Sequence, residues 1–98
     1  MITHSVFMKL KHAAGSCEEK AFLEEAARLV SIPGVLDFKV LKETSPKNDF
    51  TFGLVMNFKT RDDYDFYNNH PEHAAFVQNT WIPNVEIFQE IDYEVLTL

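Results

Sequence analysis

The sequence predicts an α+β fold in which a four-stranded antiparallel sheet carries its helices on one face. Four segments place apolar residues at every second position, which is the period of a half-buried strand. Two further segments repeat apolar residues every three or four positions, as amphipathic helices do. Their order along the 98 residues is strand, helix, strand, strand, helix, strand, which is the split βαβ arrangement.

The first strand is expected from Ile2 to Lys11, where apolar and polar residues alternate and His4 falls on the apolar face. A helix should follow, because Ser16 is a good N-cap and Glu19, three residues later, completes a capping box. The helical pattern ends at Pro33, because proline cannot continue a helix and the glycine that follows it favours a turn.

Two strands and a loop are predicted for the middle of the chain. Residues 35–41 alternate as a strand does, and the polar segment 42–49 predicts a loop after it. Residues 50–58 give the clearest alternation in the sequence and predict the third strand. Thr60 with Asp63 then gives a second N-cap signal, so a helix should begin there.

A proline divides the second helical region. Pro71 lacks an N–H group and disfavours helical geometry at His70, so it must interrupt the helix that begins after residue 60. Because proline is well accommodated at the first position of a helix, we expect a new helix over residues 71–82. Residues 86–95 close the chain as the last strand. The main apolar face of this strand is expected to hold Ile87, Ile91, Tyr93 and Val95.

Both faces of the predicted sheet carry apolar residues. The helices cover one face, and a large uncovered apolar patch on the other face favours association. A symmetric dimer that pairs two sheets would bury this patch, so we expect a homodimer. The apolar residues opposite the main apolar sets of their strands are Phe7, Val35, Val55 and Phe88.

Composition narrows the partners and the compartment. Fifteen acidic residues against nine basic ones give a net charge of −6, which argues against nucleic acid as a partner, since phosphate binding needs concentrated positive charge. Cys17 is the only cysteine, so we expect neither a disulfide nor a cysteine-based zinc site, as suits the cytoplasm. No segment has the roughly 18 apolar residues of a membrane span. We therefore expect one cytoplasmic domain, residues 1–98, with no membrane partner.

The segment YNNHPEHAAF, residues 67–76, holds the candidate functional residues. If a helix restarts at its proline, His73 shares a face with Phe76 and Val77, and this face should meet the sheet. Tyr67 lies one turn before the break, so the bend is expected to bring it toward His73. The start of a helix disfavours an imidazolium, and a neutral histidine there can accept a proton.

Each candidate also has a purely structural interpretation. His70 before Pro71 is suited to capping the turn, and Tyr67 to filling the core with its hydroxyl at the rim. His4, among apolar strand residues, is typical of a core histidine whose hydrogen bonds are satisfied. Asp92, near the end of the last strand, either orients an imidazole or lies on the solvent face.

Neither a metal nor a cofactor is expected. His70 and His73 would share a side of an unbroken helix, but Pro71 breaks their register and no cysteine adds a ligand. The three glycines are scattered along the chain, so there is no phosphate-binding loop. The sequence also has no serine or cysteine nucleophile motif.

The sequence resembles the stress-responsive A/B barrel (Dabb) family over nearly its whole length. The segments that carry the resemblance are HSVFMKLK, SIPGVLDFKV, FTFGLVMNFKTRDDYDFYNNHPEHAAFV and IDYEV. The pattern YxxHPxH is the most specific of these features. The resemblance implies a ferredoxin-like fold and a homodimer whose sheets form a shared barrel, in agreement with the order of strands and helices.

The sequence is similar at these positions to the plant polyketide cyclases of the family. This resemblance implies that Tyr67 and His73 are catalytic residues. His4, His70 and Asp92 also stand where those enzymes have the same residue types. By this resemblance His73 removes a proton from a carbon activated by carbonyls, Tyr67 holds the developing enolate, and Asp92 fixes the tautomer of the imidazole.

One position departs from the cyclases. Where they have a further pocket histidine in the third strand, this sequence has Phe52, which makes the expected pocket more apolar. The expected ligand is a small apolar, aromatic or polycarbonyl compound. Two alternatives stay open: a non-catalytic, ligand-binding or stress-associated dimer, and a cofactor-free monooxygenase acting on a phenolic or quinol substrate.

Overall fold

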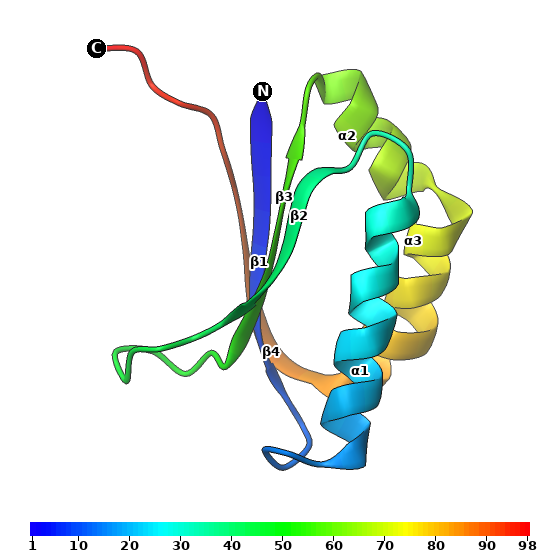
Figure 1. The fold of residues 1–98 in the computed structure, drawn as a ribbon, viewed down its shortest axis with the longest axis vertical. Coiled ribbons are helices and arrows are strands. Elements are labelled where there is room, and N and C mark those ends of the chain that lie inside the picture. The colour runs from blue at the N-terminus through cyan, green and yellow to red at the C-terminus, as the bar shows by residue number, and fades with distance from the viewer.

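A computed structural model describes residues 1–98 and has the two predicted layers (Figure 1). One layer is a four-stranded antiparallel sheet with the strand order β2-β3-β1-β4. The helices cover one face of this sheet and leave the other face open (Figure 1). The α+β, ferredoxin-like prediction is therefore confirmed. The strands are β1 (Ile2–Leu10), β2 (Leu36–Lys42), β3 (Phe52–Phe58) and β4 (Val85–Tyr93).

The first helix, α1 (Cys17–Ala27), begins where its capping signal predicts. The hydroxyl of Ser16 accepts a hydrogen bond from the backbone N–H of Glu19 at 3.2 Å. A short 3-10 turn, η1 (Arg28–Ser31), follows the helix. Gly34 then adopts a φ of 93°, a left-handed conformation that favours glycine, and leads the chain into β2.

The second helical region is divided at the proline, as predicted. The helix α2 (Arg61–Asn69) begins after Thr60, whose hydroxyl accepts a hydrogen bond from the N–H of Asp63 at 3.2 Å. The helix α3 (Pro71–Phe76) starts directly after the break. His70 between them has φ −70° and ψ 137°, which is the extended conformation favoured before proline. This one extended residue bends the path of the chain.

The single helix expected over residues 71–82 is instead three short pieces. After α3 the chain forms one turn of π-helix, η2 (Val77–Trp81), and then the short helix α4 (Ile82–Asn84). The π turn is wider than an α turn, so it shifts the direction of the side chains that follow. None of the protein's helices has the length and apolarity needed to cross a membrane.

The core lies between the sheet and the helices. Fourteen buried hydrophobic residues form one cluster, contributed by β1, β3 and the helical layer. Phe58 of β3 stacks on Tyr64, with 4.9 Å between ring centroids, and contacts Tyr67 at 5.2 Å. These rings hold α2 against the sheet and fix the position of Tyr67.

Pairing with β1 decides which face of β4 meets the helices. His4 lies opposite Asp92, and Val6 lies opposite Glu90. Cross-strand partners point to the same face, so both acidic residues share the helix side with the buried His4 and Val6. The apolar face predicted for the last strand is therefore turned to the open side of the sheet. Its residues within β4 are Ile87, Ile91 and Tyr93.

Two segments extend beyond the sheet on the side away from the helices (Figure 1). One is the loop over residues 43–51 that joins β2 to β3, and the other is residues 94–98 after β4. The second segment carries the exposed side chains of Val95, Leu96 and Leu98. The open face of the sheet is thus bordered by two projecting segments.

Candidate functional site

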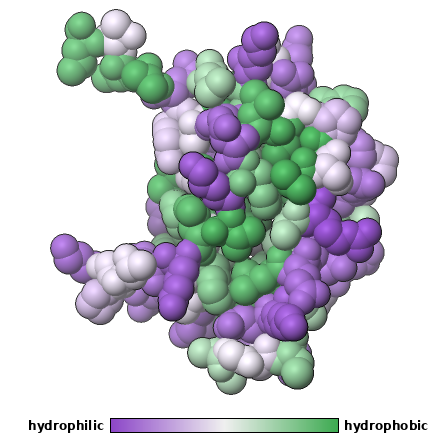
Figure 2. Space-filling view, in the orientation of Figure 1, coloured by the Kyte–Doolittle hydropathy of each residue, from purple (hydrophilic) through white to green (hydrophobic).

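A cavity of about 300 Å³ lies between the sheet and the helices. Nine of its 11 lining residues are hydrophobic, and they come mainly from β1, β3 and β4 on one side and α2, α3 and η2 on the other. Figure 2 shows a band of hydrophobic residues along the opening between the two layers, bordered by hydrophilic residues. Tyr67, His73 and Glu90 are the lining residues with ionisable side chains.

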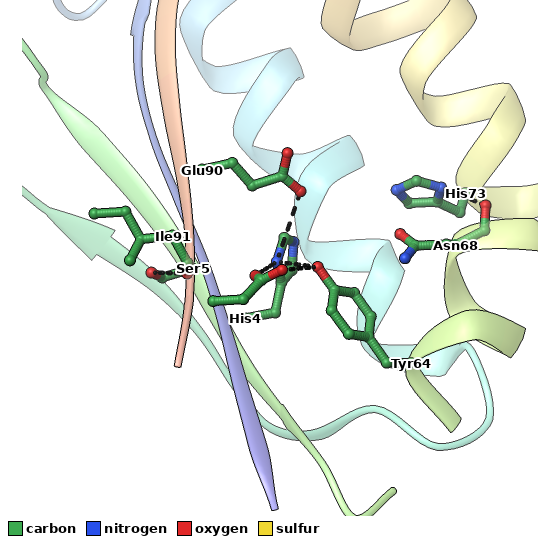
Figure 3. Close-up of polar contacts among 8 residues, drawn as sticks. His4, Ser5, Tyr64, Asn68, His73, Glu90 and Ile91 are labelled. Carbon is green, nitrogen blue, oxygen red and sulfur yellow. Dashed lines mark hydrogen bonds and ion pairs between the residues drawn. The ribbon is translucent and has the colours of Figure 1, made fainter. Parts of the chain in front are cut away.

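His73 is held by the last turn of α2. Its Nδ1 lies 3.2 Å from the backbone carbonyl oxygen of Asn68 (Figure 3). A carbonyl oxygen only accepts hydrogen bonds, so Nδ1 carries the hydrogen and Nε2 is left as an acceptor. The bend between α2 and α3 allows this contact, because it places the start of α3 beside the end of α2.

The surroundings of His73 favour its neutral form. Burial lowers the pKa of His73 below its ordinary value, and the nearby His4 lowers it further. The hydrogen bond to Asn68 and the charge of Glu90 act in the opposite direction but do not reverse the shift. His73 is therefore a neutral imidazole with a free Nε2 at neutral pH.

Tyr67 lies against His73 in the same cavity. Their ring centroids are 4.5 Å apart, and only 2% of Tyr67 is exposed. Burial raises the pKa of Tyr67, as does the charge of Glu90, so the phenol keeps its proton. The Tyr67 hydroxyl forms no hydrogen bond within the protein, whereas every fully buried polar side-chain atom has a hydrogen-bond partner. The hydroxyl is therefore not fully buried, and it opens to the cavity that Tyr67 lines. Its proton is available to a ligand.

A second group of polar residues lies next to the cavity. His4 Nδ1 donates to Asp92 Oδ1 at 2.6 Å, and the Tyr64 hydroxyl donates to Asp92 Oδ2 at 2.6 Å. Burial raises the pKa of Tyr64, and the hydrogen bond to Asp92 raises it further. Asp92 thus orients the imidazole of His4, whereas the expected partner was His73, whose tautomer is set by Asn68 instead.

Glu90 was not among the residues singled out from the sequence. Its side chain reaches from β4 toward the helical layer that carries His73 (Figure 3). Its carboxylate lies 3.7 Å from His4 Nδ1 and forms no hydrogen bond within the protein. Its spacing from Asp92 could have identified Glu90 from the sequence, because residues two apart on a strand share a face.

The remaining predicted site residues divide between the cavity and other positions. Phe76 and Val77 line the cavity beside His73. His70 does not line it, because its Nδ1 accepts a hydrogen bond from the N–H of Glu72 at 3.1 Å and caps α3. Phe52 also lies elsewhere, at a hollow beside the loop between β2 and β3. The expectation that Phe52 lines the pocket is therefore wrong.

One group of side chains has the composition of a metal site. Donor atoms of His4, Glu90 and Asp92 lie within 4.8 Å of one another. The 2.6 Å between His4 and Asp92 is a hydrogen-bond distance, and Tyr64 occupies the other oxygen of Asp92, so a metal ion would have to displace both protons. Hydrogen bonding accounts for this group without a metal ion.

The comparison with known proteins identifies a family. The sequence matches the family described as Stress responsive A/B Barrel Domain over residues 2–95. A crystal structure of a Dabb family protein with a ferredoxin-like fold from Mesorhizobium loti is 48% identical, with coverage of 98% of this chain and 97% of that chain and a TM-score of 0.96. No curated protein matches the sequence.

More distant structures share the fold. A dimeric ferredoxin-like protein of unknown function from Bacteroides fragilis is 23% identical, covers 96% of this chain and 95% of its own, and has a TM-score of 0.73. A hydroxynitrile lyase from Passiflora edulis is 17% identical and has a TM-score of 0.85. The match covers 99% of this chain and 94% of the lyase chain. Likeness at these identities concerns the fold alone. The match over residues 2–95, with the close bacterial structure, shows that the chain belongs to the stress responsive A/B barrel domain family.

Proposed function

We propose that the protein is a cofactor-free acid/base catalyst that forms an enolate in a small polycarbonyl or aromatic substrate, as a polyketide cyclase does. One observation carries the proposal. The same apolar cavity holds a neutral histidine with a free Nε2 and a tyrosine hydroxyl that no protein group occupies. These two groups, His73 and Tyr67, are the base and the hydrogen-bond donor that enolate formation requires.

The reaction proceeds without a further reagent. His73 Nε2 takes a proton from the carbon between two carbonyl groups, and the Tyr67 hydroxyl donates a hydrogen bond to the oxygen that gains negative charge. The enolate carbon then attacks a further carbonyl group of the same substrate, which forms the carbon–carbon bond of an aldol ring closure. The resulting alkoxide takes the proton back from His73. A substrate that covers the apolar walls would displace water from them, which strengthens both polar contacts.

The test is turnover of small polycarbonyl compounds by wild type and by His73→Gln and Tyr67→Phe. We expect kcat/KM to fall roughly 10²–10⁴-fold in His73→Gln, as for removal of a general base. His12→Gln is the matched control, because His12 bonds to Asn84 and does not line the cavity. Equal turnover by His73→Gln and wild type would end this assignment.

The apolar walls of the cavity also suit a second role, the binding of a small apolar ligand without conversion. In that case the affinity for the ligand, measured by calorimetry, changes little in His73→Gln, and no product forms. Measuring product and affinity on the same samples separates the two roles.

We also propose that the protein acts as a homodimer formed through the open face of the sheet. Similar structures, such as the Bacteroides fragilis protein, are described as dimeric. The open face carries apolar side chains on neighbouring strands, and a second copy placed there would lie between the two projecting segments. The open-face apolar residues of β1, β3 and β4 are Phe7, Val55, Ile87, Ile91 and Tyr93.

We place the protein in the cytoplasm. Its single cysteine, Cys17, is free and exposed, which fits a compartment that keeps thiols reduced. Fractionation of cells that express the protein would check this location.

A further inference from the structure

We propose that the cavity selects a ligand whose apolar body carries a protonated nitrogen, and that Glu90 forms the ion pair with this nitrogen at the cavity mouth. This nitrogen narrows the substrate class of the proposed function. Only the carbonyl groups of the substrate, on which His73 and Tyr67 would act, rest on that proposed function. The selection of the charged nitrogen is a property of binding alone.

Glu90 accepts no hydrogen bond from another residue of the protein. The basic group that lies within 4 Å of its carboxylate is Nδ1 of His4, at 3.7 Å, and the hydrogen of this nitrogen is already given to Asp92 at 2.6 Å. No lysine or arginine forms an ion pair with Glu90, and none lines the cavity. About half of the Glu90 side chain, 52%, is exposed, so a ligand reaches it from the cavity mouth.

Binding a ligand that leaves the Glu90 carboxylate unpaired is costly. A neutral apolar ligand would strip water from Glu90 and give it no hydrogen bond, which is unfavourable. A ligand with a carboxylate would be repelled by the charge of Glu90. A protonated amine replaces the lost water with an ion pair, so it is the ligand group that the cavity accepts best.

Aromatic rings line the same cavity as Glu90. Trp81 and Phe88 both line the cavity, and their rings meet edge to face at 5.5 Å between centroids. Phe76 packs against Trp81 at 6.2 Å. A ring that presents its face to the ligand attracts a cation, and this attraction acts in the same direction as Glu90.

The charge of the whole molecule acts in the same direction. The chain has a net charge of −6, and a second carboxylate, Asp92, lies beside Glu90 on the helix side of β4. His73, on the opposite wall, is neutral and does not repel a cation. The field of the protein therefore draws cations toward the cavity.

The test compares three probes with the same phenylbutyl body: phenylbutylamine, phenylbutanol and phenylpentanoate. Titration of each into the wild-type protein, followed by NMR shifts and calorimetry at fixed salt, gives three dissociation constants. We expect the amine to bind about 10-fold more tightly than the alcohol, and the carboxylate most weakly. In Glu90→Gln the amine should lose this advantage while the alcohol binds as before.

The control is Glu24→Gln, which removes the same charge from an exposed position on α1 outside the cavity. It should retain the preference for the amine. The inference is overturned if the amine and the alcohol bind equally to wild type, if the amine shows no binding, or if the control loses the preference as Glu90→Gln does.

Failure here is distinguishable from failure of the proposed catalysis. His73→Gln should keep the preference for the amine, because the ion pair does not involve the imidazole. A wild-type protein that prefers the amine but turns over no carbonyl compound supports the cation site and contradicts only the catalytic role. Turnover of neutral substrates with no preference for the amine supports the catalytic role and overturns the cation site.

Discussion

A single backbone carbonyl decides which nitrogen of His73 is left free to accept a proton. The carbonyl of Asn68 holds Nδ1–H, so the lone pair of Nε2 is available to the cavity. In many catalytic sites a carboxylate has this task and also stabilises the protonated ring. A carbonyl offers less charge, so the imidazolium of His73 should return its proton readily, as a step that regenerates the base requires.

The first prediction concerns the protonation of His73. Burial lowers its pKa, so its NMR titration midpoint should lie below about 6.5, the ordinary value for histidine. The ring proton signals, assigned by their loss in His73→Gln, give this midpoint directly. A midpoint above the ordinary value would contradict the neutral base.

The same shift makes stability depend on pH. The unfolded chain binds a proton to this residue at a higher pH than the folded protein does, so the free energy of unfolding falls as pH drops below about 6.5. The loss continues until the pH reaches the lower, folded pKa. Urea unfolding of His73→Gln between pH 7.5 and 5 should show a smaller loss than wild type, since glutamine does not titrate.

At the scale of elements, the break between α2 and α3 positions the site. His70 ends one helix and caps the next, since its Nδ1 accepts a hydrogen bond from the N–H of Glu72. Pro71 supplies the first residue of α3 with a fixed backbone angle. The contacts of His70 are thus those of a helix cap, as its structural interpretation predicts. His73, one turn later, faces the cavity.

The second prediction tests this cap. His70→Ala should lower the free energy of unfolding by about 1 kcal/mol, because it leaves the N–H of Glu72 without its acceptor. His70→Asn should be close to wild type, since asparagine is a good N-cap residue. Urea denaturation of the three proteins measures both effects. If His70→Asn is as unstable as His70→Ala, the side chain does more than cap the helix.

Local signals in the sequence were sufficient to predict where the helices begin. Ser16 and Thr60 cap their helices as expected, and Pro71 divides the second region as expected, because each effect depends on residues within one turn. The π turn after Phe76 has no comparable local signal. The sequence therefore predicts an unbroken helix where the structure has a wider, π-helical turn.

The site was less predictable than the fold, because contacts between distant segments build it. The bend that brings Tyr67 to His73 follows from the proline and was expected. The faces of β4 depend on its register with β1, at the other end of the sequence, so neither the place of Glu90 nor the pairing of Asp92 with His4 was predicted. The main apolar set of β4 lies on its other face, on the open side of the sheet, and it drew attention away from Glu90.

At the scale of the whole molecule, one face of the sheet is left open because the helices cover only the other face (Figure 1). The third prediction is that Ile91→Lys shifts the protein from dimer to monomer, because Ile91 lies on this face and a lysine there opposes its burial. Gel filtration with light scattering at micromolar concentration measures the mass. Val30→Lys on η1 is the control, since it alters an exposed apolar residue of the helical layer and should leave a dimer.

One residue on this face shows how closely its surface is packed. The ring of Phe7 lies over Gly53, so that a Cβ added to Gly53 would come within 2.8 Å of the ring. The aromatic side chain therefore packs closely against the neighbouring strand. An apolar ring packed in this way on the open face is available for contact with another sheet.

The hydrogen bond between His4 and Asp92 joins residues 88 positions apart. As a ribosome makes the chain, the imidazole emerges early and its acceptor only near the completion of β4. Until then β1 lacks one neighbour, and the wall that carries Glu90 does not exist. The hollow between the layers should thus appear in the same event that completes the sheet, and a nascent polypeptide halted before residue 85 should be unable to hold a ligand there.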